Sequence, residues 1–126
     1  MIIIDSDVLI EILDRKSQKG DQALNKILES KDDIATTAIS LHEVLYGLHK
    51  YGKPVTELLQ LPILSYTKKD AAFSSEIELE TEKIGNPISR TDAMITATTI
   101  NNRAKLYTFN LKHFNAAKEF GLKLFP

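Results

Sequence analysis

The chain has 126 residues, of which 43% are hydrophobic and 26% charged, with a formal net charge of −1 and no cysteine. This length predicts one domain covering residues 1–126, and the absent cysteines exclude a disulfide framework, a thiolate metal site and a thiol nucleophile. The near-zero charge excludes duplex binding by general electrostatics, so a nucleic-acid role requires a local basic rim or bound metal ions.

The amino-terminal segment starts with an apolar run, Met1–Ile4, and reaches an acid at Asp5. No basic leader region precedes this run, and no apolar stretch of membrane-spanning length follows it. We therefore expect a soluble cytoplasmic protein that does not associate with a membrane.

Strand-like segments alternate with segments of helical periodicity along the whole chain. Short β-branched or apolar runs predict strands at residues 2–4, 34–38, 62–64, 106–108 and 122–124. Apolar residues at helical spacing, bounded by Ser, Gly or Pro, predict helices at about residues 8–13, 22–28, 40–52, 55–59, 68–84, 89–102 and 112–120. This alternation predicts an α/β fold, a three-layer α/β/α sandwich with a mostly parallel sheet of four to five strands.

Asp5 directly follows the first predicted strand, Ile2–Ile4, which has the continuous β-branched pattern of a strand buried on both faces. In an open parallel sheet, ligands bind beyond the carboxyl ends of the strands, which is where this carboxylate is expected. A carboxylate is costly there unless it is paired, solvated or bound to a cation. Asp5 is therefore a candidate functional residue.

Glu43 and Asp92 are each the fourth residue of a Ser-x-x-acid run. Such runs form capping boxes at helix starts, and Thr67–Asp70 has the same pattern, so each acid also has a purely structural interpretation. Helices that follow strands in this fold class begin at the carboxyl edge of the sheet, so we expect both acids near Asp5. Three carboxylates suit Mg²⁺ or Mn²⁺, and the lack of a histidine cluster argues against zinc.

The histidines and a run of glutamates have simpler interpretations. His42, His49 and His113 form no ligand pair on one helical face, which favours surface or packing roles. Alternate residues on a helix do not share one face, so a solvated helix face is the better interpretation of Glu76, Glu78, Glu80 and Glu82.

Four blocks of the sequence resemble the motifs of PIN-domain ribonucleases. They are Asp5–Ile10 (DSDVLI), Ser40–Leu48 (SLHEVLYGL), Ile88–Ile95 (ISRTDAMI) and Leu106–Phe114 (LYTFNLKHF). Their order and spacing agree with the family over essentially the whole chain. The small size of the chain and the sequence motif EVLYGL most resemble VapC-type toxins of toxin–antitoxin pairs.

The resemblance implies a PIN-like fold and a metal-dependent endoribonuclease that hydrolyses RNA phosphodiester bonds with Mg²⁺ or Mn²⁺. Asp5, Glu43 and Asp92 match the catalytic, metal-binding acids of the family. In this chemistry the metal activates a water molecule for in-line attack on the phosphorus. The resemblance also implies a homodimer and a cognate antitoxin protein that blocks the site.

The fourth block departs from the family pattern at Asn110, where relatives often have an acid. A neutral side chain there would act through water, weaken a second metal site or be replaced by Asp7. His113 falls where an acid or a histidine is seen in relatives. Ser6 and Thr108 match positions that orient the carboxylates or the attacking water.

Contacts with the RNA backbone require cations around the cleft. The candidates are Arg90, Lys112 and His113 near the acids, with Arg15, Lys16 and Lys19 after the first predicted helix. Each of these residues is equally well explained as a solvated surface charge.

Two other functions fit parts of the sequence. The run Ile2–Asp7 resembles the start of haloacid-dehalogenase-like phosphatases, with Asp5 as nucleophile. Leu9 stands where that family has a threonine, and its late acidic pair is missing. The second alternative is a non-catalytic binding module whose acids only begin helices.

Overall fold

The computed structural model describes all residues from 1 to 126 and contains five strands. The strands are β1 (Ile2–Ile4), β2 (Ile34–Thr37), β3 (Ile63–Leu64), β4 (Lys105–Tyr107) and β5 (Lys123–Leu124). The helices are α1 (Ser6–Leu9), the π-helical η1 (Ile10–Asp14), α2 (Gln18–Ser30), α3 (Ala38–Lys50), α4 (Thr56–Leu59), α5 (Lys68–Lys83), α6 (Arg90–Asn101) and the 3₁₀-helix η2 (Leu111–Phe120). None of these helices is both long and apolar enough to cross a membrane.

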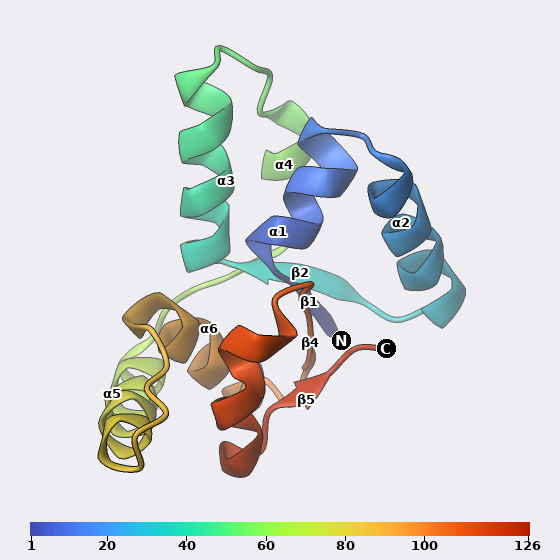
Figure 1. The fold of residues 1–126 in the computed structure, drawn as a ribbon. Coiled ribbons are helices and arrows are strands. Elements are labelled where there is room, and N and C mark those ends of the chain that lie inside the picture. Colours follow the sequence, from blue (N-terminus) through green and yellow to red (C-terminus); the bar gives the residue numbers. More distant parts are fainter.

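All paired strands are parallel, and the sheet has the order β3-β2-β1-β4-β5. The predicted α/β/α fold with a largely parallel sheet is confirmed, including all five predicted strands. Helices α1 to α4 cover one face of the sheet, and α5, α6 and η2 cover the other (Figure 1).

The central strand β1 explains why the fold has two cores. Ile2 and Ile4 pack with α1 to α4 on one face, whereas Ile3 packs with α5, α6 and η2 on the other. Successive side chains of a strand point to opposite faces, so a strand covered on both sides must be apolar throughout. The three isoleucines are accordingly buried.

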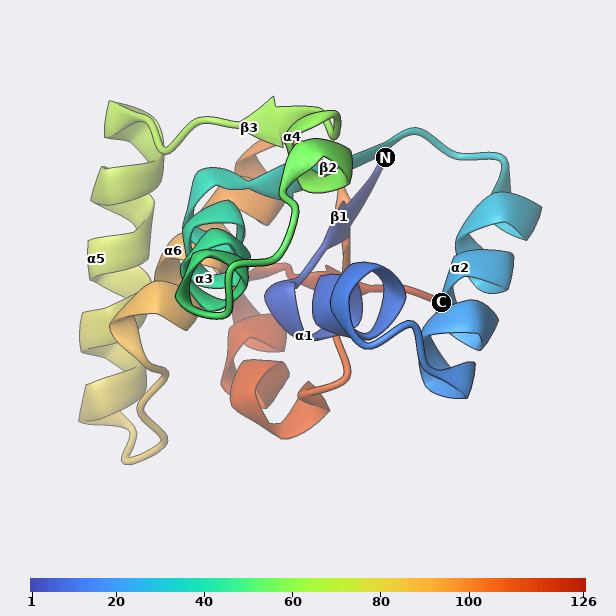
Figure 2. The same cartoon turned by 90° about the horizontal axis from the view of Figure 1, so that it is seen from above.

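Four helix starts lie at the carboxyl edge of this sheet. Helices α1 and α3 follow β1 and β2 directly, and η2 follows β4 after a short loop. Helix α6 ends just before β4 begins, so its first turn lies at the same edge, and α3 contacts both α1 and α6 (Figure 2). This arrangement brings residues 5, 43, 92 and 110 to one end of the molecule.

Three predicted helix starts were wrong. Helix α1 begins at Ser6 instead of residue 8, because the Asp5 side chain caps it by accepting from the Ser6 backbone. Helix α2 begins at Gln18 instead of residue 22, because the Ser17 side chain accepts a hydrogen bond from the Gly20 backbone at 3.0 Å. Helix α3 begins at Ala38, because Thr37 takes the cap position that the sequence pattern assigned to Ser40.

The predicted capping box of Ser40 and Glu43 is therefore also wrong. The Ser40 backbone instead donates to Thr37 Oγ1 at 3.0 Å, which frees the serine hydroxyl for another partner. The caps expected at Ser89 and Thr67 are confirmed, and Thr67 forms a complete capping box with its partner three residues later.

Candidate active site

Asp5 is held at the carboxyl end of β1 by three hydrogen bonds. Its Oδ1 accepts from the Ser6 backbone at 2.8 Å and from the Ser40 hydroxyl at 3.3 Å. Its Oδ2 accepts from the Thr108 hydroxyl at 2.8 Å. Because these donors come from three separate segments, they fix the orientation of the carboxylate. The Asp5 side chain is only 5% exposed.

The surroundings of Asp5 oppose its ionisation. Burial is the largest cause and repulsion by Asp7 the second, with a smaller repulsion from Asp92; together they raise the pKa of Asp5 to about 6. The hydrogen bonds from Thr108 and Ser6 lower that pKa without cancelling the rise. Asp5 is therefore a buried acid among other acids.

Glu43 and Asp92 reach the same edge from α3 and α6. Burial raises the pKa of Glu43, and repulsion by Asp5, Asp92 and Asp7 raises it further. Asp92 lies in the first turn of α6, where its backbone donates to the Ser89 hydroxyl at 3.2 Å. The structure thus places four carboxylates close enough to repel one another.

Asp7 joins this cluster through the loop after β4. Its Oδ2 accepts from the Phe109 backbone at 3.0 Å, while its Oδ1 is buried without a hydrogen-bond partner. Burial raises the pKa of Asp7, and the Phe109 and Asn110 backbones and the Lys19 charge oppose the rise. Lys19 also lies over the Phe109 ring, with its Nζ 4.0 Å from the ring centre.

The fourth block contributes backbone rather than side chain at Asn110. The Asn110 backbone donates to Thr108 Oγ1 at 3.1 Å, whereas its side chain makes no hydrogen bond to the acids. His113, three residues on, lies with its Nδ1 3.8 Å from Asp92 Oδ2. Of the three positions considered for completing the site, Asp7 lies among the acids and His113 lies beside Asp92, whereas the Asn110 side chain makes no hydrogen bond to either.

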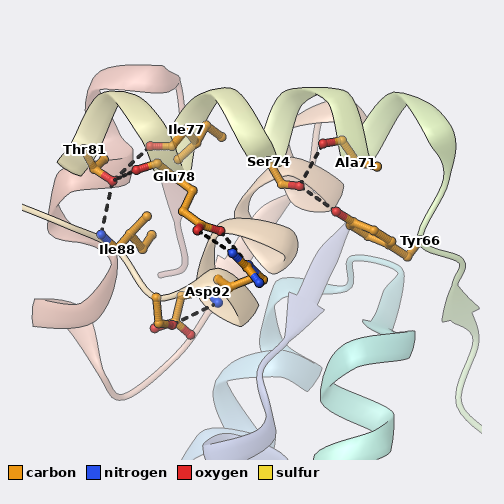
Figure 3. Close-up of polar contacts among 10 residues, drawn as sticks. Tyr66, Ala71, Ser74, Ile77, Glu78, Thr81, Ile88 and Asp92 are labelled. Carbon is orange, nitrogen blue, oxygen red and sulfur yellow. Dashed lines mark hydrogen bonds and ion pairs between the residues drawn. The ribbon is translucent and has the colours of Figure 1, made fainter. Parts of the chain in front are cut away.

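Arg90, expected from the sequence to contact RNA, instead forms an ion pair with Glu78. Its Nε and Nη2 donate to the two carboxylate oxygens of Glu78 at 3.1 and 3.2 Å. Figure 3 shows Glu78 on α5 reaching toward the first turn of α6, next to Asp92. Glu78 is thus an interhelical partner rather than part of a purely solvated face.

Sequence reasoning missed the role of Ser40. The hydroxyl was interpreted as a helix cap, but it is fully buried and donates to Asp5. A signal was present in the sequence, because Thr37 lies three residues earlier and caps a helix equally well.

The oxygen donors at this edge partly meet the requirements of a divalent cation. In this arrangement no group of three or more His, Asp or Glu side chains is close enough to hold a metal ion. The donors nevertheless fit in type and place, because mutually repelling carboxylates meet at one edge and Asp7 Oδ1 is a buried acceptor with no donor. Oxygen ligands of this kind suit Mg²⁺ or Mn²⁺.

Comparisons with known proteins show similarity over nearly the whole chain. Ribonuclease VapC1 of Methanocaldococcus jannaschii is 28% identical over 127 aligned positions, which cover 98% of this chain and 86% of that protein. The structure of VapBC2 from Rickettsia felis bound to a DNA fragment from their promoter contains a chain 25% identical to this one. The match covers 99% of this chain and 98% of that chain, with a TM-score of 0.81.

A toxin–antitoxin complex from Klebsiella pneumoniae has the same fold in a chain 24% identical to this one. The match covers 90% of each chain, with a TM-score of 0.73. The model of the PIN domain family matches residues 2–119, which is nearly the whole chain. This chain belongs to the PIN domain family.

Proposed function

We propose that this chain is a Mg²⁺- or Mn²⁺-dependent endoribonuclease and the toxin of a toxin–antitoxin pair. The observation that carries the proposal is the meeting of Asp5, Glu43 and Asp92, from three separate elements, at the carboxyl edge of a PIN-domain sheet. The similarity to a protein named as a ribonuclease supports RNA as the substrate.

Asp5, Glu43 and Asp92 would hold the metal ion, with Asp7 as a further candidate ligand and Asn110 as a ligand through water. When bound, such an ion stabilises negative charge on the phosphoryl oxygens and lowers the pKa of water. The chain's own part is orientation. Thr108 and the Ser6 backbone hold the Asp5 carboxylate in one orientation, so less reorganisation is required during reaction.

The phosphatase alternative has little support from the sequence. Leu9 stands where that family has a threonine, and its late acidic pair is missing. The PIN domain family model instead matches residues 2–119. We therefore assign Asp5 to metal binding.

The decisive experiment compares the wild type with Asp5→Asn on structured and unstructured RNA, in Mg²⁺, Mn²⁺ or EDTA. Cleavage is expected only from the wild type with a divalent metal. Asp33→Asn is a matched control, because Asp33 is an exposed aspartate just before β2, at the opposite edge of the sheet. Equal cleavage by both variants, or cleavage in EDTA, would contradict the proposal, and no cleavage at all would favour the non-catalytic binding module.

The toxin role predicts a partner and a growth phenotype. An apolar hollow of about 260 Å³ lies between η1, α2 and α4, and Leu24 and Leu28 are exposed on α2. An antitoxin segment with apolar side chains would cover this surface. Expression of the wild-type chain alone should arrest the growth of host cells, while Asp5→Asn should not; equal growth of both cultures would argue against the toxin role.

We also propose a homodimer, which the exposed Tyr46 and the neighbouring Leu45 on α3 support as a surface for a second copy. Sedimentation velocity is expected to give twice the chain mass of 14.2 kDa. A single species at the chain mass would exclude the dimer.

A further inference from the structure

Two hollows flank the first turn of α6, on either side of the segment that carries Arg90 and Asp92. The hollow of about 340 Å³ on the α5 side is lined by Tyr66, Ser74, Glu78, Glu82, Arg90 and Met94, among others. The hollow of about 280 Å³ on the η2 side is lined by Asn86, Ser89, Asp92, Lys112, His113 and Ala116, among others. Both are large enough for part of a nucleotide. The charges that line each hollow therefore decide which of the two could bind RNA.

The α5 hollow is unfavourable for RNA. Its single cation, Arg90, is neutralised by the two hydrogen bonds to Glu78, and Glu82 adds a second carboxylate. A phosphate entering this hollow would have to compete with Glu78 for the guanidinium and would be repelled by Glu82. Arg90 therefore links α5 to α6 and is a poor contact for an RNA backbone.

The η2 hollow has the opposite character. Lys112 is exposed and takes part in no ion pair, and His113 is 62% exposed with its Nδ1 3.8 Å from Asp92 Oδ2. The only carboxylate in the lining is Asp92, which belongs to the candidate active site. The Asn86 backbone donates a hydrogen bond to the Thr81 carbonyl, and the Asn86 side chain makes no hydrogen bond. A free ammonium and a free amide thus lie in one hollow together with Asp92, one of the three proposed metal-binding acids.

We propose that the η2 hollow binds the nucleotide next to the scissile bond of a single-stranded RNA, with Lys112 contacting its phosphate. This inference rests on the proposed ribonuclease function and adds the side of the site along which the RNA runs. An ammonium is a compact point charge that binds phosphate without a fixed orientation. Asn86 then offers an amide donor and acceptor to the edge of an unpaired base.

The test measures RNA binding separately from cleavage. A fluorescent single-stranded RNA is titrated with the Asp5→Asn protein in EDTA, at several NaCl concentrations, and anisotropy is recorded. Lys112→Gln in this background is expected to weaken binding about three- to tenfold and to reduce the salt slope by about 0.7, the loss of one phosphate contact. In the otherwise wild-type enzyme the same substitution should raise KM for RNA and leave kcat within about twofold.

Two variants provide the controls. Lys118→Gln removes an exposed lysine from the same helix, outside the lining of the hollow, and should leave the affinity and the salt slope unchanged. Arg90→Gln should also bind RNA like the parent protein, because Glu78 already occupies its guanidinium. Unchanged binding by Lys112→Gln, or an equal loss in Arg90→Gln or Lys118→Gln, overturns the inference. If the parent protein binds no RNA in EDTA while the wild type still cleaves RNA in Mg²⁺, this inference fails and the proposed function stands. If binding and cleavage are both absent, both fail.

Discussion

Two aspartates of this chain are almost equally buried but lie in opposite environments. Asp5 is 5% exposed and Asp70 is 2% exposed, and each accepts hydrogen bonds on both carboxylate oxygens. Asp70 accepts from the Thr67 backbone at 3.0 Å and from Asn101 Nδ2 at 2.8 Å, which ties the start of α5 to the end of α6. Hydrogen bonding alone therefore does not separate a functional acid from a structural one.

The difference lies in the neighbouring charges. Asp5 is repelled by Asp7 and Asp92, and it repels Glu43 in turn. Asp70 lies in the first turn of α5, where the helix dipole favours a negative charge. Crowded like charges cost stability and persist where a cation or a reaction requires them, which makes crowding the better guide to function.

Removing a proposed metal-binding acid should reduce activity far more than removing the structural acid Asp70. Glu43→Gln and Asp92→Asn should each reduce RNA cleavage in Mg²⁺ on the order of 100- to 1,000-fold, because each removes a proposed metal ligand. Asp70→Asn should cleave RNA at a rate within about threefold of the wild type at a temperature where it is folded, because it touches no group of the site. Single-turnover cleavage assays measure these rates; a comparable loss in Asp70→Asn would remove the distinction between the two acids.

The second prediction concerns how the free energy of unfolding depends on pH through Asp5. The pKa of Asp5 rises from its ordinary value of 3.8 to about 6 in the folded protein. An acid with a raised folded-state pKa stabilises the fold below its unfolded pKa, and this contribution is lost as the pH increases through about 6. Each pKa unit corresponds to about 1.4 kcal/mol, so the free energy of unfolding in EDTA should fall by roughly 2.5 kcal/mol between pH 4 and pH 7.5 on account of Asp5.

Asp5→Asn is the matched variant for this pH dependence. The amide carries no charge, and its oxygen can keep the hydrogen bonds from the Ser6 backbone and the Ser40 hydroxyl while the Thr108 hydroxyl reverses to accept from the amide nitrogen. Urea unfolding at several pH values should therefore give a flatter profile and a more stable protein at pH 7.5 than the wild type. A profile as steep as that of the wild type would assign the dependence to other groups.

The sequence was sufficient for the order of the elements and for the meeting of the three acids. Apolar periodicity predicts each strand and helix, and the strand ends place Asp5, Glu43 and Asp92 at one edge. The sequence was insufficient where two neighbouring residues could each cap the same helix. Thr37 and Ser40 both cap helices well, and the choice depends on a contact with Asp5 that is 35 residues away in the chain.

The same limit applies to the pairing of Glu78 with Arg90. The alternation of glutamates along α5 gives no indication of which one faces a neighbouring helix. That choice follows from the packing of α5 against α6, which brings together residues twelve positions apart. Local patterns predict which residues begin a helix, whereas tertiary contacts select the partners of their side chains.

A smaller effect comes from Asp70 itself. Asp70→Asn should lower the free energy of unfolding by about 1–3 kcal/mol, because both of its oxygens face N–H donors that cannot accept a hydrogen bond. The new amide hydrogens would lie against the Thr67 backbone or against Asn101. Thermal and urea unfolding at pH 7.5 measure the loss. A stability gain, as expected for Asp5→Asn, would show that the two acids are equivalent after all.

The smallest effect separates the two serines that share the Ser-x-x-acid pattern. Ser89→Ala removes a helix cap and should cost about 1 kcal/mol at every pH. Ser40→Ala removes a longer bond to Asp5, so it should cost about 0.5–1 kcal/mol at pH 7.5 and almost nothing at pH 4, where Asp5 is protonated. It should also move the midpoint of the pH profile upward, because the Asp5 carboxylate loses a donor. A cost independent of pH in both variants would mean that Ser40 is only a packing residue, and that crowding at Asp5 is balanced by Thr108 and the Ser6 backbone alone.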